Sequence, residues 1–260
     1  MIDVFKKITV DFDYMKLRND VNHVYHAIKE QAVNTQYEAL AYRNICITAS
    51  KPNSDDWTDG IAGKTYVNKT GAQGKQGVLT SQVGDDSNEM LDETQFVHPI
   101  KQIQGLYLEE FVKSFKDVYR WRISILPPRT TLSIHKDGSF LMQTLNTTGA
   151  ILDWRLHFPI VTNNRCFLVN WPDNFGTPKD EGETVPLEMA HFKAGSSYLL
   201  NTSKIHCATN YSDSERIHLI ASLGKDTIET FQKPKDFVMS TWAEVVLCEL
   251  LHLEMQFLIY

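Results

Sequence analysis

The sequence predicts a mainly β protein built around a double-stranded β-helix, a cupin-like jelly roll, with helices flanking it at the N-terminal and C-terminal ends. Short segments between residues 118 and 223 alternate or run apolar, with Gly, Asn, Asp and Pro between them, as strands of a sandwich or barrel do. Residue types that bind metals lie on segments far apart in the chain, and a jelly roll brings such strands to one opening. The predicted strands are VYRWRISIL, TTLSIH, WRLHFPIV, CFLVN, LEMAHF, SSYLLN and ERIHLIASL.

The region before these strands is predicted to be helix and loop. Residues 105–117 predict a short helix. In residues 12–32, the histidines His23 and His26 have H-x-x-H spacing but no partner ligands nearby, so they are interpreted as solvent-facing or packing residues. Apolar residues recur at helical spacing in the same stretch and predict an amphipathic helix: Met15, Leu17, Val21, Val24, Tyr25 and Ile28.

Two further stretches carry less pattern. Residues 50–95 are polar and dotted with glycine, and such length within a compact domain predicts either a lid over the barrel or a surface insertion. Trp57, the large aromatic residue there, is a candidate substrate contact. The stretch STWAEVVLCELLHLEMQFLIY at residues 240–260 predicts an apolar helix whose charges exclude a membrane span. It would pack on the barrel or form a homo-oligomer contact.

Composition indicates one domain over residues 1–260: a helical and loop region to residue 117, a jelly-roll core at 118–224 and a C-terminal helix at 225–260. A net charge of −6 without a basic cluster argues against nucleic acid as a partner. The N-terminus has no apolar signal segment. The cysteines are scattered without a C-x-x-C pair, so we expect reduced thiols and a cytoplasmic location; they are Cys46, Cys166, Cys207 and Cys248.

A metal site is predicted at His135, Asp137 and His206. Residues i and i+2 of a strand point to the same side, so His135 and Asp137 can reach one ion, with His206 supplied by a distant strand. Two imidazoles and one carboxylate leave three positions of an octahedral Fe(II) open for a co-substrate and O2. The alternative for Asp137 is a hairpin turn with Gly138.

Arg216 follows His206 by ten residues and is predicted to anchor a dicarboxylate co-substrate. Its planar guanidinium can meet a carboxylate through two parallel charge-assisted hydrogen bonds and stays charged at any working pH. The alternative is a surface salt bridge with Asp213 or Glu215, which would contribute little.

Three blocks in order resemble the aspartyl/asparaginyl β-hydroxylase family of 2-oxoglutarate-dependent oxygenases, which includes bacterial enzymes similar to proline hydroxylases. They are RWRISILPPRTTLSIHKDGSF, WRLHFPI and AGSSYLLNTSKIHCATNYSDSERIHLIASL, and the resemblance covers about residues 118 to 223. It implies that Ser124 and Arg216 bind the distal carboxylate of 2-oxoglutarate. It also implies that His157 contacts the metal-proximal carboxylate; the alternatives for His157 are a third metal ligand or an interior histidine.

The chain departs from the family at two points. Arg122, Ser124, Leu126 and Pro127 match the family's R-x-S-x-L-x-P-G pattern, but Pro128 stands where the glycine would be, so we expect a differently shaped turn. Animal members hold the metal with two histidines and have no acidic residue at the position of Asp137. The chain is therefore more similar to the bacterial branch or to a member with the full triad.

The function implied is hydroxylation of an Asp, Asn or Pro type of amino acid, free or in a polypeptide, with Fe(II), O2 and 2-oxoglutarate. One rival is a catalytically silent jelly roll that binds metal and 2-oxoglutarate, and another is a cupin-like metal-dependent isomerase. Neither accounts as well for Ser124, His157 and Arg216 together. Candidate substrate contacts are Trp57, Trp121, Arg155 and His218.

Overall fold

The computed structural model describes residues 4–34, 43–60, 93–132, 154–170 and 188–224, together with Thr227. The predicted C-terminal helix and most of the 50–95 loop therefore lie outside the described residues. Within them the protein is mainly β, with all strand pairs antiparallel.

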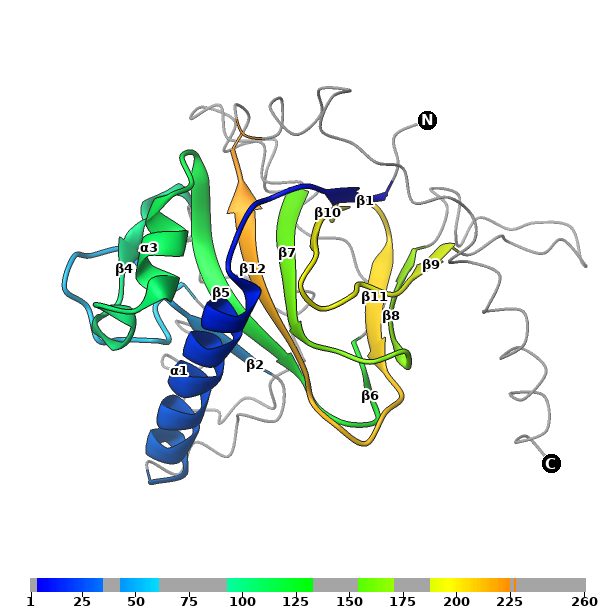
Figure 1. Cartoon of the computed structure of the whole chain (residues 1–260), viewed down its shortest axis with the longest axis horizontal. Coiled ribbons are helices and arrows are strands. Elements are labelled where there is room, and N and C mark those ends of the chain that lie inside the picture. The colour runs from blue at the N-terminus through cyan, green and yellow to red at the C-terminus, as the bar shows by residue number, and fades with distance from the viewer. Residues whose placement is uncertain are drawn as a thin grey trace, which may run out of the picture.

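Two sheets form the body of the molecule (Figure 1). The larger has six strands in the order β1-β10-β7-β12-β5-β2. These are β1 (Phe5–Ile8), β10 (Ser197–Asn201), β7 (Trp154–Val161), β12 (Arg216–Leu223), β5 (Val118–Leu126) and β2 (Arg43–Cys46). The smaller has the order β6-β11-β8-β9, with β6 (Thr130–Thr131), β11 (His206–Asn210), β8 (Cys166–Asn170) and β9 (Glu188–Ala190). From β5 to β12 the chain passes between the two sheets in the strand order of a jelly roll.

Apolar side chains on opposite faces of the larger sheet form two separate cores. Odd-numbered residues of β5, among them Trp121 and Ile123, pack with α1 (Tyr14–Asn34) and α3 (Tyr107–Lys113) on the outer face. Even-numbered Leu126 faces the smaller sheet. There it packs in a second core with Leu168, Phe192, Tyr198, Leu200 and Ala208. We call this second side, which lies between the sheets, the inner face. In Figure 1 the helices lie on the side of the larger sheet away from β6, β8 and β11.

Both predicted N-terminal helices are present, although their bounds differ from those predicted. Five of the six predicted apolar residues of α1 are buried, but Met15 is exposed. His23 and His26 are exposed, as expected for solvent-facing residues. Short elements complete this side: the 3-10 helices η2 (Glu93–Gln95) and η3 (Lys101–Ile103) and the strand pair β3 (Thr48–Ala49) and β4 (His98–Pro99).

The predicted strands at 118–126, 154–161 and 166–170 have the bounds observed for β5, β7 and β8. β6, β9, β10 and β12 are shorter than their predicted segments, and residues 133–135 of TTLSIH lie outside the described residues. A turn joins β5 to β6 through Pro127 and Pro128, with Arg129 at φ 53°. Strands β1, β2 and β11 were not predicted.

Candidate active site

The inner face of the larger sheet gathers the predicted co-substrate residues from three neighbouring strands. Ser124 of β5 pairs with His218 of β12, and Ile220 of β12 pairs with His157 of β7. Arg216, the first residue of β12, lies opposite Leu126, which belongs to the inner core. His157, Arg216 and His218 are each at most 5% exposed. Alternation along three strands thus brings residues up to 94 positions apart (218 − 124) to one face.

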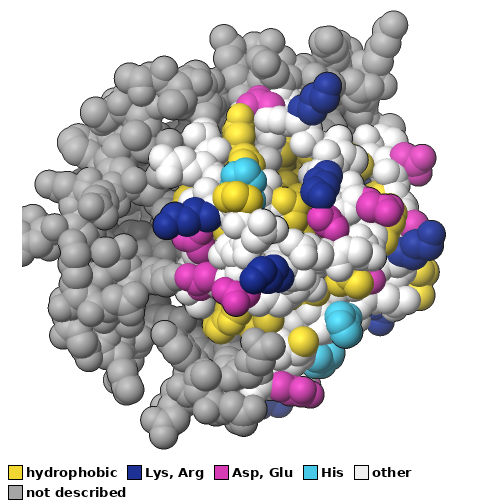
Figure 2. Space-filling view, turned by 90° about the vertical axis from the view of Figure 1, so that its left-hand side faces the viewer, with side chains coloured by type: hydrophobic (Ala, Val, Ile, Leu, Met, Phe, Trp, Pro, Cys, Tyr) yellow, Lys and Arg dark blue, Asp and Glu magenta, His cyan; other side chains and the backbone are white. Residues whose placement is uncertain are grey.

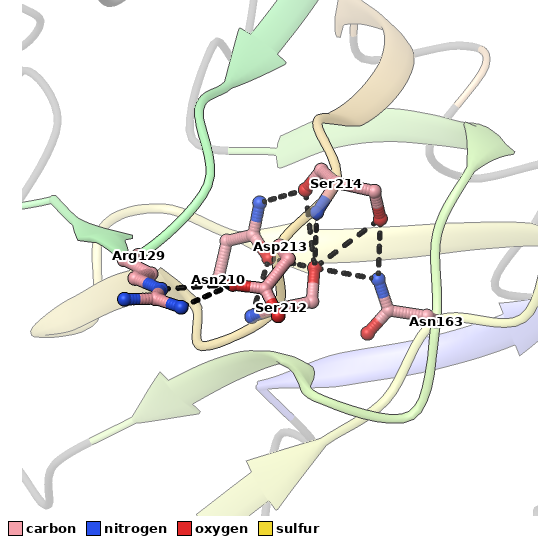
Figure 3. A network of polar contacts seen from close by, with 6 residues as sticks. All are labelled: Arg129, Asn163, Asn210, Ser212, Asp213 and Ser214. Atoms are coloured by element: carbon pink, nitrogen blue, oxygen red, sulfur yellow. Dashed lines mark hydrogen bonds and ion pairs between the residues drawn. The ribbon is translucent and has the colours of Figure 1, made fainter.

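The turn that precedes Arg216 is held by a network of polar contacts (Figure 3). The side-chain amide of Asn210 donates to the carbonyl oxygens of Leu126 at 3.0 Å and Ser214 at 2.8 Å, which ties the turn to the end of β5. In the same turn Asp213 accepts hydrogen bonds from the guanidinium of Arg129, whose side chain is exposed.

The alternative for Arg216, a surface salt bridge, does not fit this arrangement. Glu215 accepts a hydrogen bond from the Tyr25 hydroxyl at 2.8 Å, and Asp213 pairs with Arg129, while Arg216 itself is buried. Arg216 and His218 line a crevice that has no space for a water molecule among the described residues, together with Thr162, Cys166, Phe167, Leu168 and Phe192. A buried guanidinium is suited to binding an anion.

His157 and His218 form a neutral pair beside this arginine. Burial, and then the charge of Arg216, hold the pKa values of both histidines well below the usual range. Nδ1 of His218 lies 3.3 Å from Nη2 of Arg216 and 3.4 Å from Nδ1 of His157. A guanidinium can only donate hydrogen bonds, so Nδ1 of His218 accepts one from Arg216. In the contact between the two histidines, the proton is then on Nδ1 of His157.

That tautomer leaves a lone pair on Nε2 of His157, and this atom has no hydrogen-bond partner among the described residues. A metal needs a lone pair at that atom, whereas a carboxylate needs a proton there. The two roles predicted for His157 therefore require opposite tautomers. His218 carries its ring proton on Nε2, and this atom also has no hydrogen-bond partner within the described part of the chain.

His206 has the hydrogen bond that a metal-ligating histidine requires. It is 5% exposed on β11, and its Nδ1 lies 2.8 Å from the carbonyl oxygen of Lys204. A proton on Nδ1 places the lone pair on Nε2, which is the usual way a protein orients a histidine ligand. His206 shares its side of β11 with Ala208 of the inner core, and its charge is among those that lower the pKa of His157. It therefore lies on the inner face.

The other two predicted ligands, His135 and Asp137, lie outside the described residues. Among the residues that are described, no three His, Cys, Asp or Glu side chains come together to hold a metal. Cys207 alternates with His206 along β11 and is absent from the inner core.

A second polar group, which we call the arginine cluster, consists of Arg120, Arg122 and Arg155 around Glu93. Glu93 accepts hydrogen bonds from Arg120 at 2.5 Å, from Arg155 at 3.2 Å and from the Ser222 hydroxyl. All of these side chains are buried. Burial would raise the pKa of Glu93, but Arg155, Arg120 and Arg122 together hold it at about 2. Glu93 is thus ionised throughout the physiological range.

Sequence reasoning found Arg155 but missed Glu93, which lies in the polar stretch before the strands. Its partners Arg120, Arg155 and Ser222 are 27, 62 and 129 positions away, so no spacing signal connects them. Arg155 is placed on the inner face, next to the co-substrate candidates, because Ser222 of β12 is its strand neighbour.

Two predicted substrate contacts lie elsewhere. Trp121 is 1% exposed in the outer core, where it stacks on Phe158 and meets Phe111 edge to face. Trp57 is half-buried and packs against the same core, with its carbonyl oxygen accepting a hydrogen bond from the Cys46 amide. Both are separated from the inner face by the larger sheet, so their placement does not support a substrate role. His218 is buried beside Arg216 rather than on a rim.

Residues 106–225 match the family model for aspartyl/asparaginyl β-hydroxylase. The match covers 120 of the 260 residues of the chain (225 − 106 + 1). The match contains every strand from β5 to β12, and it confirms the predicted family and the predicted class of enzyme, an oxygenase. Glu93 lies outside it. No match was found among curated protein sequences.

Solved structures similar to this chain include a cupin domain from Bordetella pertussis Tohama I (14% identity, 43% of this chain and 86% of that chain, TM-score 0.28). Others are AviO1 from Streptomyces viridochromogenes Tue57 (10%, 86% and 90%, TM-score 0.42) and a 2OG-Fe(II) oxygenase family oxidoreductase from Burkholderia pseudomallei (8%, 83% and 91%, TM-score 0.33). Because these scores are low, the assignment rests on the family match and on the site.

The side of the hydroxylase that bears α3 and β4 shows acidic and basic side chains interspersed with apolar ones (Figure 2). The described residues form no continuous basic patch on this side. None of the described helices is long and apolar enough to cross a membrane.

Proposed function

We propose that this hydroxylase domain is an Fe(II)- and 2-oxoglutarate-dependent dioxygenase that hydroxylates an amino acid, free or in a polypeptide. The observation that carries the proposal is Arg216, a buried guanidinium that shares the inner face with Ser124, His157 and His218. The planar pair of donors of such a guanidinium fits the distal carboxylate of 2-oxoglutarate.

The residues divide into three tasks. His135, Asp137 and His206 hold the iron, and the Nδ1 contact of His206 supports its part. Arg216 binds the far carboxylate, assisted by the hydroxyl of Ser124. His157 contacts the near carboxylate in the tautomer that carries its proton on Nε2, which is opposite to the tautomer favoured by its contact with His218. When bound, iron and 2-oxoglutarate supply the oxidation of an unactivated C–H bond, with conversion of 2-oxoglutarate and O2 to succinate and CO2. The protein then selects the substrate by the position in which it holds that bond.

The rival functions fit the interior less well. A Lewis-acid isomerase has no use for a buried arginine at the distance of a second carboxylate. A silent binding module would retain the co-substrate residues but form no succinate. Asp, Asn and Pro types of substrate all remain within this proposal.

The Arg216→Lys variant is expected to bind 2-oxoglutarate more weakly by roughly 1.5–3 kcal/mol, because lysine keeps the charge but loses the planar pair of donors. The measurement is calorimetric titration of 2-oxoglutarate into Fe(II)-loaded protein without oxygen. Arg129→Lys is the matched control, since Arg129 is an exposed cation in the neighbouring turn. Iron binding should be the same in all three proteins. Unchanged 2-oxoglutarate affinity in Arg216→Lys would show that Arg216 does not bind the far carboxylate.

A further inference from the structure

Arg122 is a buried cation that the co-substrate assignment does not use. It lies two residues before Ser124 on β5, and its side chain shares the inner face with that serine. The residue is 9% exposed, and its Nε has no hydrogen-bond partner among the described residues. The neighbouring carboxylate, Glu93, forms its ion pairs with Arg120 and Arg155 instead.

The charges around Arg122 do not balance within the described interior. The buried charged side chains there are four guanidiniums, those of Arg120, Arg122, Arg155 and Arg216, and the single carboxylate of Glu93. Burial, and then repulsion from Arg120, lower the pKa of Arg122 to about 10, so it is still charged at neutral pH. Glu93 already pairs with Arg120 and Arg155, so a further anion would be needed to neutralise Arg122, and a buried charge without a counter-ion is unfavourable.

Arg122 is also separate from the place assigned to the far carboxylate. Arg216 lies opposite Leu126, and Arg122 is four positions earlier on the same strand, opposite Ile220. At the rise of a β-strand this is about 13 Å along β5. His157 pairs with the same Ile220 from the other side of β12, and its pKa is lowered by both Arg216 and Arg122. Arg122 therefore lies in the same row of the sheet as His157, and it is close enough to Arg155 for that charge to lower its pKa.

We propose that Arg122 binds a carboxylate of the primary substrate. The inference rests on the proposed function, in which the far carboxylate of 2-oxoglutarate belongs to Arg216. It narrows the substrate to a free amino acid, which has a carboxylate near the reacting carbon. Asn or Pro residues within a polypeptide offer no such group.

The test uses the full chain loaded with Fe(II) and 2-oxoglutarate without oxygen, so that binding is measured apart from turnover. L-Aspartate, L-asparagine and L-proline are titrated, each beside its carboxamide, into the wild type, Arg122→Met and Arg129→Met. Methionine is apolar and of similar length, so the melting temperature of unliganded Arg122→Met should equal or exceed that of the wild type. Arg129→Met removes an exposed cation from the β5–β6 turn as a charge control.

The expected result is that the wild type and Arg129→Met bind at least one free amino acid, and bind its carboxamide much more weakly. Arg122→Met should bind that amino acid roughly tenfold or more weakly, the effect of losing one charge-assisted hydrogen bond, and should bind 2-oxoglutarate as the wild type does. The proposal is overturned if no free amino acid binds better than its carboxamide, if Arg122→Met binds it normally, or if Arg122→Met loses affinity for 2-oxoglutarate instead. Failure of the proposed function would look different, because the wild type would then not bind 2-oxoglutarate.

Discussion

Replacing Glu93 with Gln is expected to lower the free energy of unfolding by roughly 3–5 kcal/mol, the usual cost of removing one partner of a buried ion pair. Glu93 is the carboxylate that Arg120 and Arg155 share, and Arg122 is close enough to lower its pKa. Glutamine keeps the size of the side chain but leaves three guanidiniums buried together. The measurement is urea unfolding at neutral pH.

The control for this prediction is Glu188→Gln, because Glu188 is an exposed acidic residue on β9. A surface change of this kind should alter stability by no more than about 0.5 kcal/mol. Equal stability of Glu93→Gln and the wild type would show that the arginines of the cluster do not depend on this carboxylate.

The difference in stability between the wild type and Glu93→Gln should also depend on pH. The folded-state pKa of Glu93 is about 2, below the ordinary value of 4.5, so its stabilisation is complete above about pH 5 and is lost as pH falls toward 2. The stability difference between the wild type and Glu93→Gln should therefore shrink by about 3 kcal/mol across that window. A difference that stays constant between pH 5 and pH 2 would contradict the assigned pKa.

His206→Ala is expected to remove most of the affinity for Fe(II). Losing a direct ligand should cost more than the roughly 10–100-fold that follows loss of an outer-shell partner. Equilibrium dialysis against Fe(II) without oxygen measures it, and His26→Ala on the exposed side of α1 is the control. Wild-type iron affinity in His206→Ala would remove His206 from the site.

Asp137→Ala then separates two binding modes, because retained activity would place the chain with the two-histidine members of the family.

Strand alternation explains why part of this site was predictable. The segments of β5, β7 and β12 are apolar enough to be recognised as strands, and the parity of their residues places Ser124, His157 and Arg216 on one side. The same parity argues against Trp121, whose odd number on β5 puts it among Phe111 and Phe158 in the outer core. Trp121 was predicted as a substrate contact, whereas alternation along the strand requires a core residue there.

Glu93 and β11 were missed for different physical reasons. Glu93 accepts hydrogen bonds from three partners that are distant in sequence. An isolated acidic residue in a polar stretch gives no periodic signal that could predict these contacts. The β11 segment HCATN has a short, weakly apolar sequence and is held as a strand by pairing with β6 and β8. Tertiary pairing, rather than local preference, determines that strand and with it the position of His206.

Succinate formation is the measurement that tests the central claim most directly. The purified chain is incubated with Fe(II), ascorbate, O2 and 2-oxoglutarate, with and without the amino acid that binds best, beside the Arg216→Lys and His206→Ala variants. The account predicts succinate and CO2 in equal amounts from the wild type, stimulated by the amino acid, with much less from Arg216→Lys and none above background from His206→Ala. Quantitative recovery of unreacted 2-oxoglutarate from iron-loaded wild type under every condition would contradict it.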